Sequence, residues 1–94
     1  MEITDFLWLP RVEEKIESKH GVTREEVEQV LDRQPRVRRW QRGKFQGEDV
    51  YRALGRSDGG RYLTVFFIYK QTGEALILSA RAMDAKERRS YAKK

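Results

Sequence analysis

The spacing of apolar residues in the first third of the chain predicts a short strand followed by two helices. Residues 3–9 are typical of a strand or extended arm, and Pro10 suits the first position of a helix, where a missing N–H is harmless. Val12 and Ile16 lie four positions apart, on one side of that helix. Gly21 can adopt the left-handed conformation that ends many helices, so we expect the first helix to stop there.

The second helix is expected over residues 23–32. Thr23 and Glu26 form a capping-box pattern, in which each side chain can bond the backbone N–H of the other residue. The apolar residues that follow share one helical face: Val27, Val30 and Leu31. Pro35 cannot continue the helix, so the helix is expected to end before it.

A basic segment follows, with six Lys or Arg and two aromatic residues between positions 33 and 48. It predicts a strand over residues 36–42 and then a loop that contains Lys44. Alternation along the strand would place four side chains on one face: Arg36, Arg38, Trp40 and Arg42. Arginine interleaved with an aromatic residue suits the binding of bases and phosphates. An edge strand kept soluble by its charge explains the pattern equally well.

The second half of the chain has the pattern of a three-stranded antiparallel meander. Strands are expected at 50–56, 61–70 and 75–81, joined by turns that contain glycine. Both faces of 66–68 are apolar, which indicates a central strand covered by helices. Asp84 can cap a last helix that has Glu87 at its third position and runs to about Ala92.

These elements follow the order β-α-α-β-β-β-β-α, which predicts an α+β fold. We expect an antiparallel meander packed with two N-terminal helices and one C-terminal helix. With 94 residues, the chain has room for a single domain, 1–94.

The amino-acid composition indicates the cellular compartment in which the protein works. The chain has no cysteine, which excludes disulfides and zinc–thiolate sites and suits a reducing compartment. No N-terminal stretch has the pattern of a signal peptide, and the longest apolar run, 63–69, is too short to cross a bilayer. We therefore expect a soluble cytoplasmic protein that does not bind a membrane.

The charge of the chain is unevenly distributed. The net charge is +5, yet residues 1–32 hold nine acidic and four basic side chains, whereas residues 33–94 hold six acidic and sixteen basic ones. Such asymmetry favours a polyanionic partner, either a nucleic acid or an acidic protein, over a purely solubilising role for the basic residues.

The available side chains limit the chemistry. His20 is the only histidine and stands at a helix end before Gly21, where a capping or packing role is favoured over catalysis. No metal-ligand spacing and no nucleotide-binding glycine motif is present, so we expect neither a metal nor a cofactor. Arginine and tyrosine still suffice for RNA cleavage, because RNA carries its own nucleophile, the 2′-hydroxyl. Arginine can bind the phosphate, and a tyrosine near cations can assist proton transfer.

Four candidate site residues are expected to converge. Arg56 and Arg81 end strands that flank the same central strand and run in the same direction, so both should emerge at one end of the sheet. Arg88 and Tyr91 lie three positions apart on the last helix and share one face. In the alternative interpretation, Arg56 pairs with Asp58, Glu87 takes a nearby arginine and Tyr91 packs in the core.

Three segments resemble a known family when taken in order: KHGVTREEVEQVL (19–31), YRALGRSDGGRYLTVFFIY (51–69) and ILSARAMDAKERRSY (77–91). They are similar to the BrnT family of type II toxins, small ribonucleases related in fold to the RelE toxins. The resemblance covers about three quarters of the chain. Its most specific parts are the KHG turn, the GR-S-x-x-G-R hairpin, and S-A-R followed by E-R-R-x-Y.

The resemblance implies a sheet flanked by helices, metal-independent RNA cleavage and arrest of translation. It also implies a cognate antitoxin, usually a ribbon-helix-helix DNA-binding protein, in a toxin–antitoxin hetero-oligomer. Five positions match family motifs: Arg56, Arg81, Arg88, Arg89 and Tyr91. On this basis, Arg56 and Arg81 are expected to bind phosphate, Tyr91 and Arg88 to assist proton transfer or stabilise the leaving group, and Arg89 to contact nucleic acid.

Two departures from the family stand out. Family members often have an F-x-W-D pattern near the N-terminus, whereas Trp8 is followed here by Leu9 and Pro10. The segment 33–49 is also longer and more basic than the usual connection. A non-catalytic basic module that binds RNA or a protein partner therefore stands as the alternative to an endoribonuclease toxin.

Overall fold

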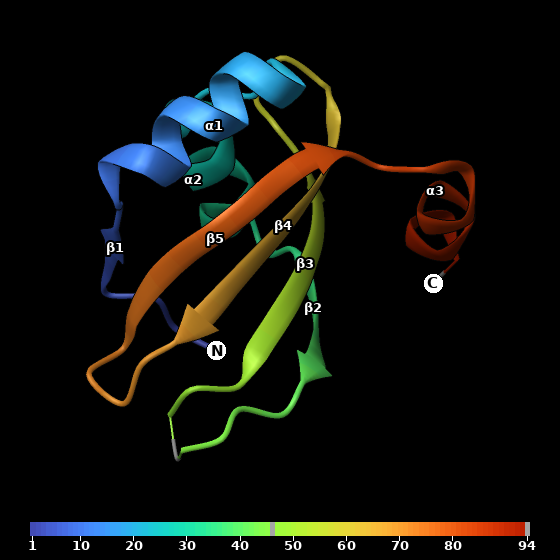
Figure 1. The fold of residues 1–94 in the computed structure, drawn as a ribbon. Helices are drawn as coiled ribbons and strands as arrows, with labels where there is room; N and C mark the ends of the chain where they lie inside the picture. Colours follow the sequence, from blue (N-terminus) through green and yellow to red (C-terminus); the bar gives the residue numbers. More distant parts are fainter. Residues whose placement is uncertain (46, 94) are drawn as a thin grey trace.

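The computed structural model describes residues 1–45 and 47–93, which form a five-stranded sheet with helices on both sides (Figure 1). The order of elements is the predicted one: β1 (Asp5–Leu7), α1 (Pro10–His20), α2 (Arg24–Asp32), β2 (Arg36–Gln41), β3 (Val50–Arg56), β4 (Tyr62–Tyr69), β5 (Glu74–Ala82) and α3 (Ala85–Ala92). The predicted α+β fold is confirmed. Within the described ranges, no helix has the length and apolar character needed to span a membrane.

The strands lie in the order β1-β5-β4-β3-β2. Strands β2 to β5 form an antiparallel meander, and β1 adds to its edge by pairing in parallel with β5. The sheet is therefore mixed. Hydrophobic spacing predicts that residues 3–9 are extended, but it carries no information about this pairing, which is made with a segment about 70 residues away.

The two faces of the sheet have different roles. Leu63, Val65 and Phe67 of β4 are fully buried against the helices on the inner face, the face that packs on α1 and α2. Tyr62, Thr64 and Phe66 alternate with them and so lie on the outer face. Helix α3 lies over one end of this outer face, on the side of the sheet opposite α1 and α2 (Figure 1).

Local signals explain where α1 ends and α2 begins. Gly21 adopts φ 63° at the end of α1, a left-handed conformation suited to glycine. Thr23 and Glu26 form the predicted capping box at the start of α2. A Cβ at Gly55 would lie 2.9 Å from Val30 Cγ1, so the glycine allows α2 to approach β3 closely.

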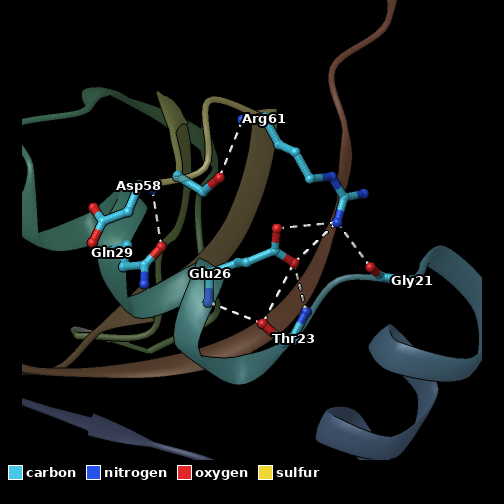
Figure 2. A network of polar contacts seen from close by, with 7 residues as sticks. Gly21, Thr23, Glu26, Gln29, Asp58 and Arg61 are labelled. Atoms are coloured by element: carbon cyan, nitrogen blue, oxygen red, sulfur yellow. Dashed lines mark hydrogen bonds and ion pairs between the residues drawn. The ribbon is translucent and has the colours of Figure 1, made fainter.

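The β3–β4 hairpin is tied to α2 by a polar network (Figure 2). Arg61 Nη1 donates to the Gly21 carbonyl at 2.9 Å and to both carboxylate oxygens of Glu26 at 3.0 and 3.1 Å. Asp58 N donates to Gln29 Oε1 at 3.0 Å. The hairpin, the turn after α1 and the capping box therefore hold one another in place.

The prediction for the basic segment needs one correction. Strand β2 ends at Gln41, and its register with β3 shifts between Arg39 and Gln41, which places a β-bulge at Trp40. The bulge interrupts the alternation, so Arg42 does not continue a regular face with Arg36 and Arg38. Arg42 and Lys44 lie beyond the strand, and Lys44 Nζ stands 5.9 Å from the ring of Phe45.

Candidate active site

Arginines gather on the outer face because the strands alternate with a period of two. Arg52 and Arg56 lie opposite Phe66 and Tyr62 of β4, so both belong to this face. On β2, Arg36 and Arg38 lie opposite Leu54 and Arg52, and they extend the basic surface toward the edge of the sheet. Outer-face positions of β2 and β3 therefore supply four guanidinium groups.

Two tyrosines contact two of these arginines and one arginine of α3. Together they form an arginine–tyrosine cluster, which consists of Arg36, Arg56, Tyr62, Arg88 and Tyr91. The rings of Tyr62 and Tyr91 meet edge to face, with centroids 6.0 Å apart. The guanidinium carbons of Arg56 and Arg88 lie 4.7 and 3.9 Å from the centroid of Tyr62, and that of Arg36 lies 5.5 Å from the centroid of Tyr91. Helix α3 and strands β2, β3 and β4 thus contribute to a single basic cluster.

The cluster retains its positive charge. Within residues 1–45 and 47–93, Arg36, Arg56 and Arg88 form no ion pair with a carboxylate. Asp58, the proposed partner of Arg56, instead pairs with Arg33 at 3.1 Å. This part of the alternative interpretation is wrong. Three uncompensated guanidinium groups on one surface are suited to binding phosphate.

Tyr91 is half-buried between the ring of Tyr62 and the guanidinium of Arg36, rather than packed in the inner core. Arg36 also donates from Nη1 to the backbone carbonyl of Ser90 at 3.0 Å, and this bond holds α3 against β2. The ring of Tyr91 is therefore fixed by contacts from both sides.

A second group of residues surrounds Glu87, whose side chain is only 5% exposed. Arg81 donates to Oε1 at 2.7 Å and to Oε2 at 3.0 Å, in a two-pronged ion pair. The Thr64 hydroxyl and the backbone N–H of Asp84 also donate to Oε1, each at 2.9 Å. Arg52 Nη1 lies 3.8 Å from Oε2. This Glu87 network connects α3 to β3, β4 and β5.

Ionisation of Glu87 is favoured despite burial. Burial alone raises the pKa of this carboxyl, but the hydrogen bonds from Arg81, from the Asp84 backbone and from Thr64 outweigh it, so the net pKa is lowered from 4.5. The hydrogen bond to Glu87 in turn raises the pKa of the Arg81 guanidinium. Glu87 therefore takes an arginine, as the alternative interpretation predicts, and Arg81 belongs to a compensated ion pair.

Two open clefts lie between α3 and the outer face. The larger, about 540 Å³, has Trp40 and Arg52 on the sheet side and Lys86 and Ser90 on the helix side. The smaller, about 280 Å³, is lined by Arg36 and also by Arg52 and Ser90. Because the two clefts share lining residues, they form one basic groove. A cavity of about 700 Å³ is lined by Ile3, Leu31, Val37, Tyr51 and their neighbours, and it has neither arginine nor lysine in its lining.

Comparison with protein-family models matches residues 8–87 to a family described as "Ribonuclease toxin, BrnT, of type II toxin-antitoxin system". The chain belongs to the BrnT family. It is thus a ribonuclease toxin, and its type II system implies a cognate antitoxin. The resemblance seen in the sequence is confirmed.

The fold agrees with this assignment. The crystal structure of the Brucella abortus ribonuclease toxin BrnT is similar, with a TM-score of 0.62 and 17% sequence identity, over 85% of this chain and 96% of that chain. At such low identity the likeness establishes the fold. No curated protein matches the sequence.

The residues of the motifs on which the resemblance rests fall into two spatial groups. In the hairpin motif, Arg56 faces the arginine–tyrosine cluster, whereas Arg61 fastens the hairpin to α2 (Figure 2). In the E-R-R-x-Y motif, Glu87 holds α3 on the sheet, whereas Arg88 and Tyr91 enter the cluster. Each motif therefore combines anchoring residues with residues of the arginine–tyrosine cluster.

Arg89 is a predicted nucleic-acid contact that the fold separates from the groove. It is exposed and lies two positions, about 200° around the helix, after buried Glu87. It therefore lies on the side of α3 that is turned away from the sheet.

Sequence reasoning missed Arg52 and Tyr62; it foresaw that Glu87 takes a nearby arginine, but not that this pair anchors α3 to the sheet. The signal for Arg52 was present, because the residue lies four positions before Arg56 in one strand and so shares its face. Tyr62 follows in the same way from its place opposite Arg56. Among the described residues, no group of three or more His, Asp or Glu side chains is arranged to hold a metal ion.

Proposed function

We propose that this BrnT-family toxin cleaves RNA without a metal, at the arginine–tyrosine cluster. The observation that carries the proposal is the placement of Arg36, Arg56 and Arg88 around Tyr62 and Tyr91 without a neutralising carboxylate among the described residues. A surface of this kind can bind a phosphate diester and stabilise the additional negative charge of its transition state.

In the proposed reaction, the 2′-oxygen attacks the adjacent phosphorus and the bond from phosphorus to the 5′-oxygen breaks. The products are a 2′,3′-cyclic phosphate and a free 5′-hydroxyl, so one proton leaves the 2′-oxygen and one reaches the 5′-oxygen. Arg56 and Arg88 bind the phosphate oxygens. Tyr91, held by Arg36 and Tyr62, donates its proton to the departing 5′-oxygen, while water accepts the proton of the 2′-hydroxyl and afterwards restores that of Tyr91. Arg88 stabilises the charge on the leaving oxygen, because a guanidinium stays protonated.

Arg81 contributes in two ways in this proposal. Three of its five N–H donors are engaged with Glu87 and the Ala82 carbonyl, which leaves one N–H on Nη2 and the Nε–H for a phosphate oxygen. Its ion pair with Glu87 also holds α3 in position, and α3 carries Arg88 and Tyr91. Arg81 therefore serves mainly in positioning, and only secondarily in phosphate binding.

The cellular role follows from RNA cleavage and from the family. We propose that the chain arrests translation in the cytoplasm by cutting RNA, and that a ribbon-helix-helix antitoxin neutralises it in a hetero-oligomer. Co-purification of the chain with the product of a neighbouring small gene tests the partner. An antitoxin with a different DNA-binding fold would contradict this part of the proposal.

RNA cleavage in the presence of EDTA tests the mechanism. Wild type should cut single-stranded RNA and leave cyclic phosphate ends. Tyr91→Phe should lower kcat by about 10²- to 10⁴-fold and Arg88→Ala by about 10²- to 10³-fold. Arg81→Ala should lower activity as well, with circular dichroism used to confirm that the variant is folded.

The possible outcomes test the assigned site, the metal-independent mechanism and the ribonuclease activity separately. Cleavage that survives in Tyr91→Phe and Arg88→Ala would disprove the assigned site and leave the ribonuclease in place. Loss of wild-type cleavage on addition of EDTA would disprove the metal-independent mechanism. If wild type and variants bind RNA and none of them cuts it, the chain is a binding module.

A further inference from the structure

Trp40 is a large, exposed aromatic side chain beside the proposed site. It stands at the β-bulge of an edge strand and is 55% exposed, although a large indole normally gains stability by burial. Trp40 continues the alternation of Arg36 and Arg38, so its ring lies on the outer face, against Arg52 and Phe66. An aromatic ring therefore stands at the rim of the groove.

The ring is held rather than free. Phe66 of β4 meets it edge to face at a centroid distance of 5.6 Å, and the guanidinium carbon of Arg52 lies over it at 4.8 Å. Arg52 is itself fixed, because its side chain is only 14% exposed and Nη1 lies 3.8 Å from Glu87. One face of the indole is thus covered by a positioned cation. At 55% exposure, more than half of the residue remains accessible to a ligand.

The cleft beside Trp40 fits an aromatic heterocycle. Its volume of about 540 Å³ falls within the usual range for small-molecule sites. Arg38 and Lys86 add positive charge at its walls, whereas Asp84 and Ser90 offer hydrogen-bond acceptors. A stacking surface together with cations and acceptors matches a nucleotide better than it matches a purely apolar ligand.

Trp40 lies close enough to the arginine–tyrosine cluster for one RNA strand to contact both. Arg52, which backs Trp40, and Arg56, in the arginine–tyrosine cluster, are four residues apart along β3, about 13 Å at the usual strand rise. Stacked bases advance about 3.4 Å per nucleotide of a strand, so this distance spans at most about four nucleotides. A base near the cleaved phosphate can reach the ring.

We propose that Trp40, backed by Arg52, is a stacking subsite for a base of single-stranded RNA that lies near the cleaved phosphate. The proposal rests on the proposed function and adds to it the strandedness of the substrate. Bases inside an A-form duplex are already stacked on one another and cannot lie flat on Trp40. The subsite therefore selects unpaired RNA.

Cleavage kinetics provide the first test, with short single-stranded RNA and the same RNA annealed to its complement. Trp40→Leu should lower kcat/KM on the single strand by roughly 5- to 150-fold, the usual contribution of one stacked base, whereas Trp40→Phe should retain most activity. Phe45→Leu is the matched control, because Phe45 is also an exposed aromatic residue, at 68%, but does not line the groove. Its activity should remain unchanged.

An abasic substitution identifies the stacked base itself. Removing the base from one nucleotide near the cleavage point should slow wild type by about the same factor as Trp40→Leu, but it should not slow Trp40→Leu further. If the two losses instead multiply, the residue and the base act independently and the subsite is disproved. Equal cleavage of single strand and duplex by wild type would also overturn the proposal.

Binding gives a readout that does not depend on cleavage. Single-stranded RNA should quench the tryptophan fluorescence of the Tyr91→Phe protein, and the quenching should disappear when Trp40→Phe is added. If wild type cuts no RNA, the proposed function fails, and the quenching alone still decides the subsite. A Trp40→Leu protein that loses affinity for the antitoxin but not for RNA would place Trp40 in a protein interface and overturn the proposal.

Discussion

At the scale of single residues, the buried carboxylate of Glu87 fixes the positions of Arg52 and Arg81 on the outer face. A buried carboxylate is stable only where hydrogen bonds and opposite charges replace its water, and Arg81, Thr64 and the Asp84 backbone provide them at 2.7–2.9 Å. Removing the carboxylate charge leaves Arg52 and Arg81 without their shared partner. The residue therefore positions two arginines.

Glu87→Gln should destabilise the protein at neutral pH by roughly 3 kcal/mol, because it breaks a buried ion pair. The value is at the lower end of the usual range for such pairs, since Arg81 is partly exposed. Urea unfolding measures this loss. The folded pKa of Glu87 is lowered, so its stabilising contribution is complete above pH 4.5 and disappears as the pH falls through the folded value. The difference between wild type and variant should therefore shrink below pH 4.5.

Glu14→Gln is the matched control, because Glu14 is an exposed carboxylate on α1. It should unfold like wild type at neutral pH. A constant difference between Glu87→Gln and wild type across the acid range would contradict the lowered pKa. A Glu87→Gln protein as stable as wild type at neutral pH would contradict the anchoring role.

At the scale of elements, the β3–β4 hairpin shows that one motif can serve two purposes. Arg56 is directed to the cluster, whereas Arg61 joins the hairpin to the Gly21 carbonyl and to Glu26 (Figure 2). Arg61 is 42% exposed, which reduces the energy of its ion pair but leaves its geometry intact. Its bonds join three separate segments of the chain.

Arg61→Ala should lower the free energy of unfolding by about 1 kcal/mol, because the hydrogen bonds are charge-assisted but partly screened by solvent. The folded variant should keep wild-type kcat on RNA. Arg33→Ala, which removes a more exposed ion pair with Asp58, should cost less than about 0.5 kcal/mol. If Arg61→Ala is as stable as wild type and has a reduced kcat, Arg61 acts at the site instead.

The start of α1 gives a second prediction at this scale. Leu9 occupies the N-cap position in an extended conformation and provides no side-chain hydrogen bond. Leu9→Asp should stabilise the protein by about 1 kcal/mol by capping the helix. Thermal unfolding measures the gain. Leu9→Ala removes the same exposed side chain without adding an acceptor and should give no gain; an equal gain in both variants would contradict the capping explanation.

Charge separation is the main property at the scale of the whole molecule. Seven of the nine acidic residues in the first third belong to α1 and α2, which cover the inner face of the sheet, whereas the outer face carries Arg36, Arg38, Arg52 and Arg56. A polyanion is therefore attracted to the outer face and repelled from the opposite side. This separation favours approach of RNA in the orientation that the proposed site requires.

Salt dependence tests how many phosphates the cluster neutralises. If Arg36, Arg56 and Arg88 each bind one phosphate, log Kd for single-stranded RNA should rise with log salt with a slope of about 2, at about 0.7 per phosphate. Fluorescence anisotropy with the Tyr91→Phe protein between about 50 and 200 mM salt measures the slope. Arg88→Gln should reduce it by about 0.7. Lys19→Gln, at the end of α1, should leave it unchanged, and a reduction equal to that of Arg88→Gln would contradict local neutralisation.

Local signals made most of the elements predictable. The capping boxes at Thr23 and Asp84, the left-handed Gly21 and the period-two strands all act within a few residues, so their pattern is complete in the sequence. The shared direction of the two strands that flank β4 predicted Arg56 and Arg81 at one end of the sheet, and the register confirms this placement. The catalytic roles of these residues stay predictions.

The sequence by itself determined the element order, the α+β class, the basic character of the second half and, through its motifs, the BrnT family. Only the tertiary structure decided which arginines are free and which are engaged, because Glu87 could pair with any arginine that the fold brings near. It likewise decided that a bulge at Trp40 separates this residue from Arg42, since strand register depends on a partner strand. Helix periodicity is encoded locally, whereas pairing of charges and register across strands are settled by residues far apart in the chain.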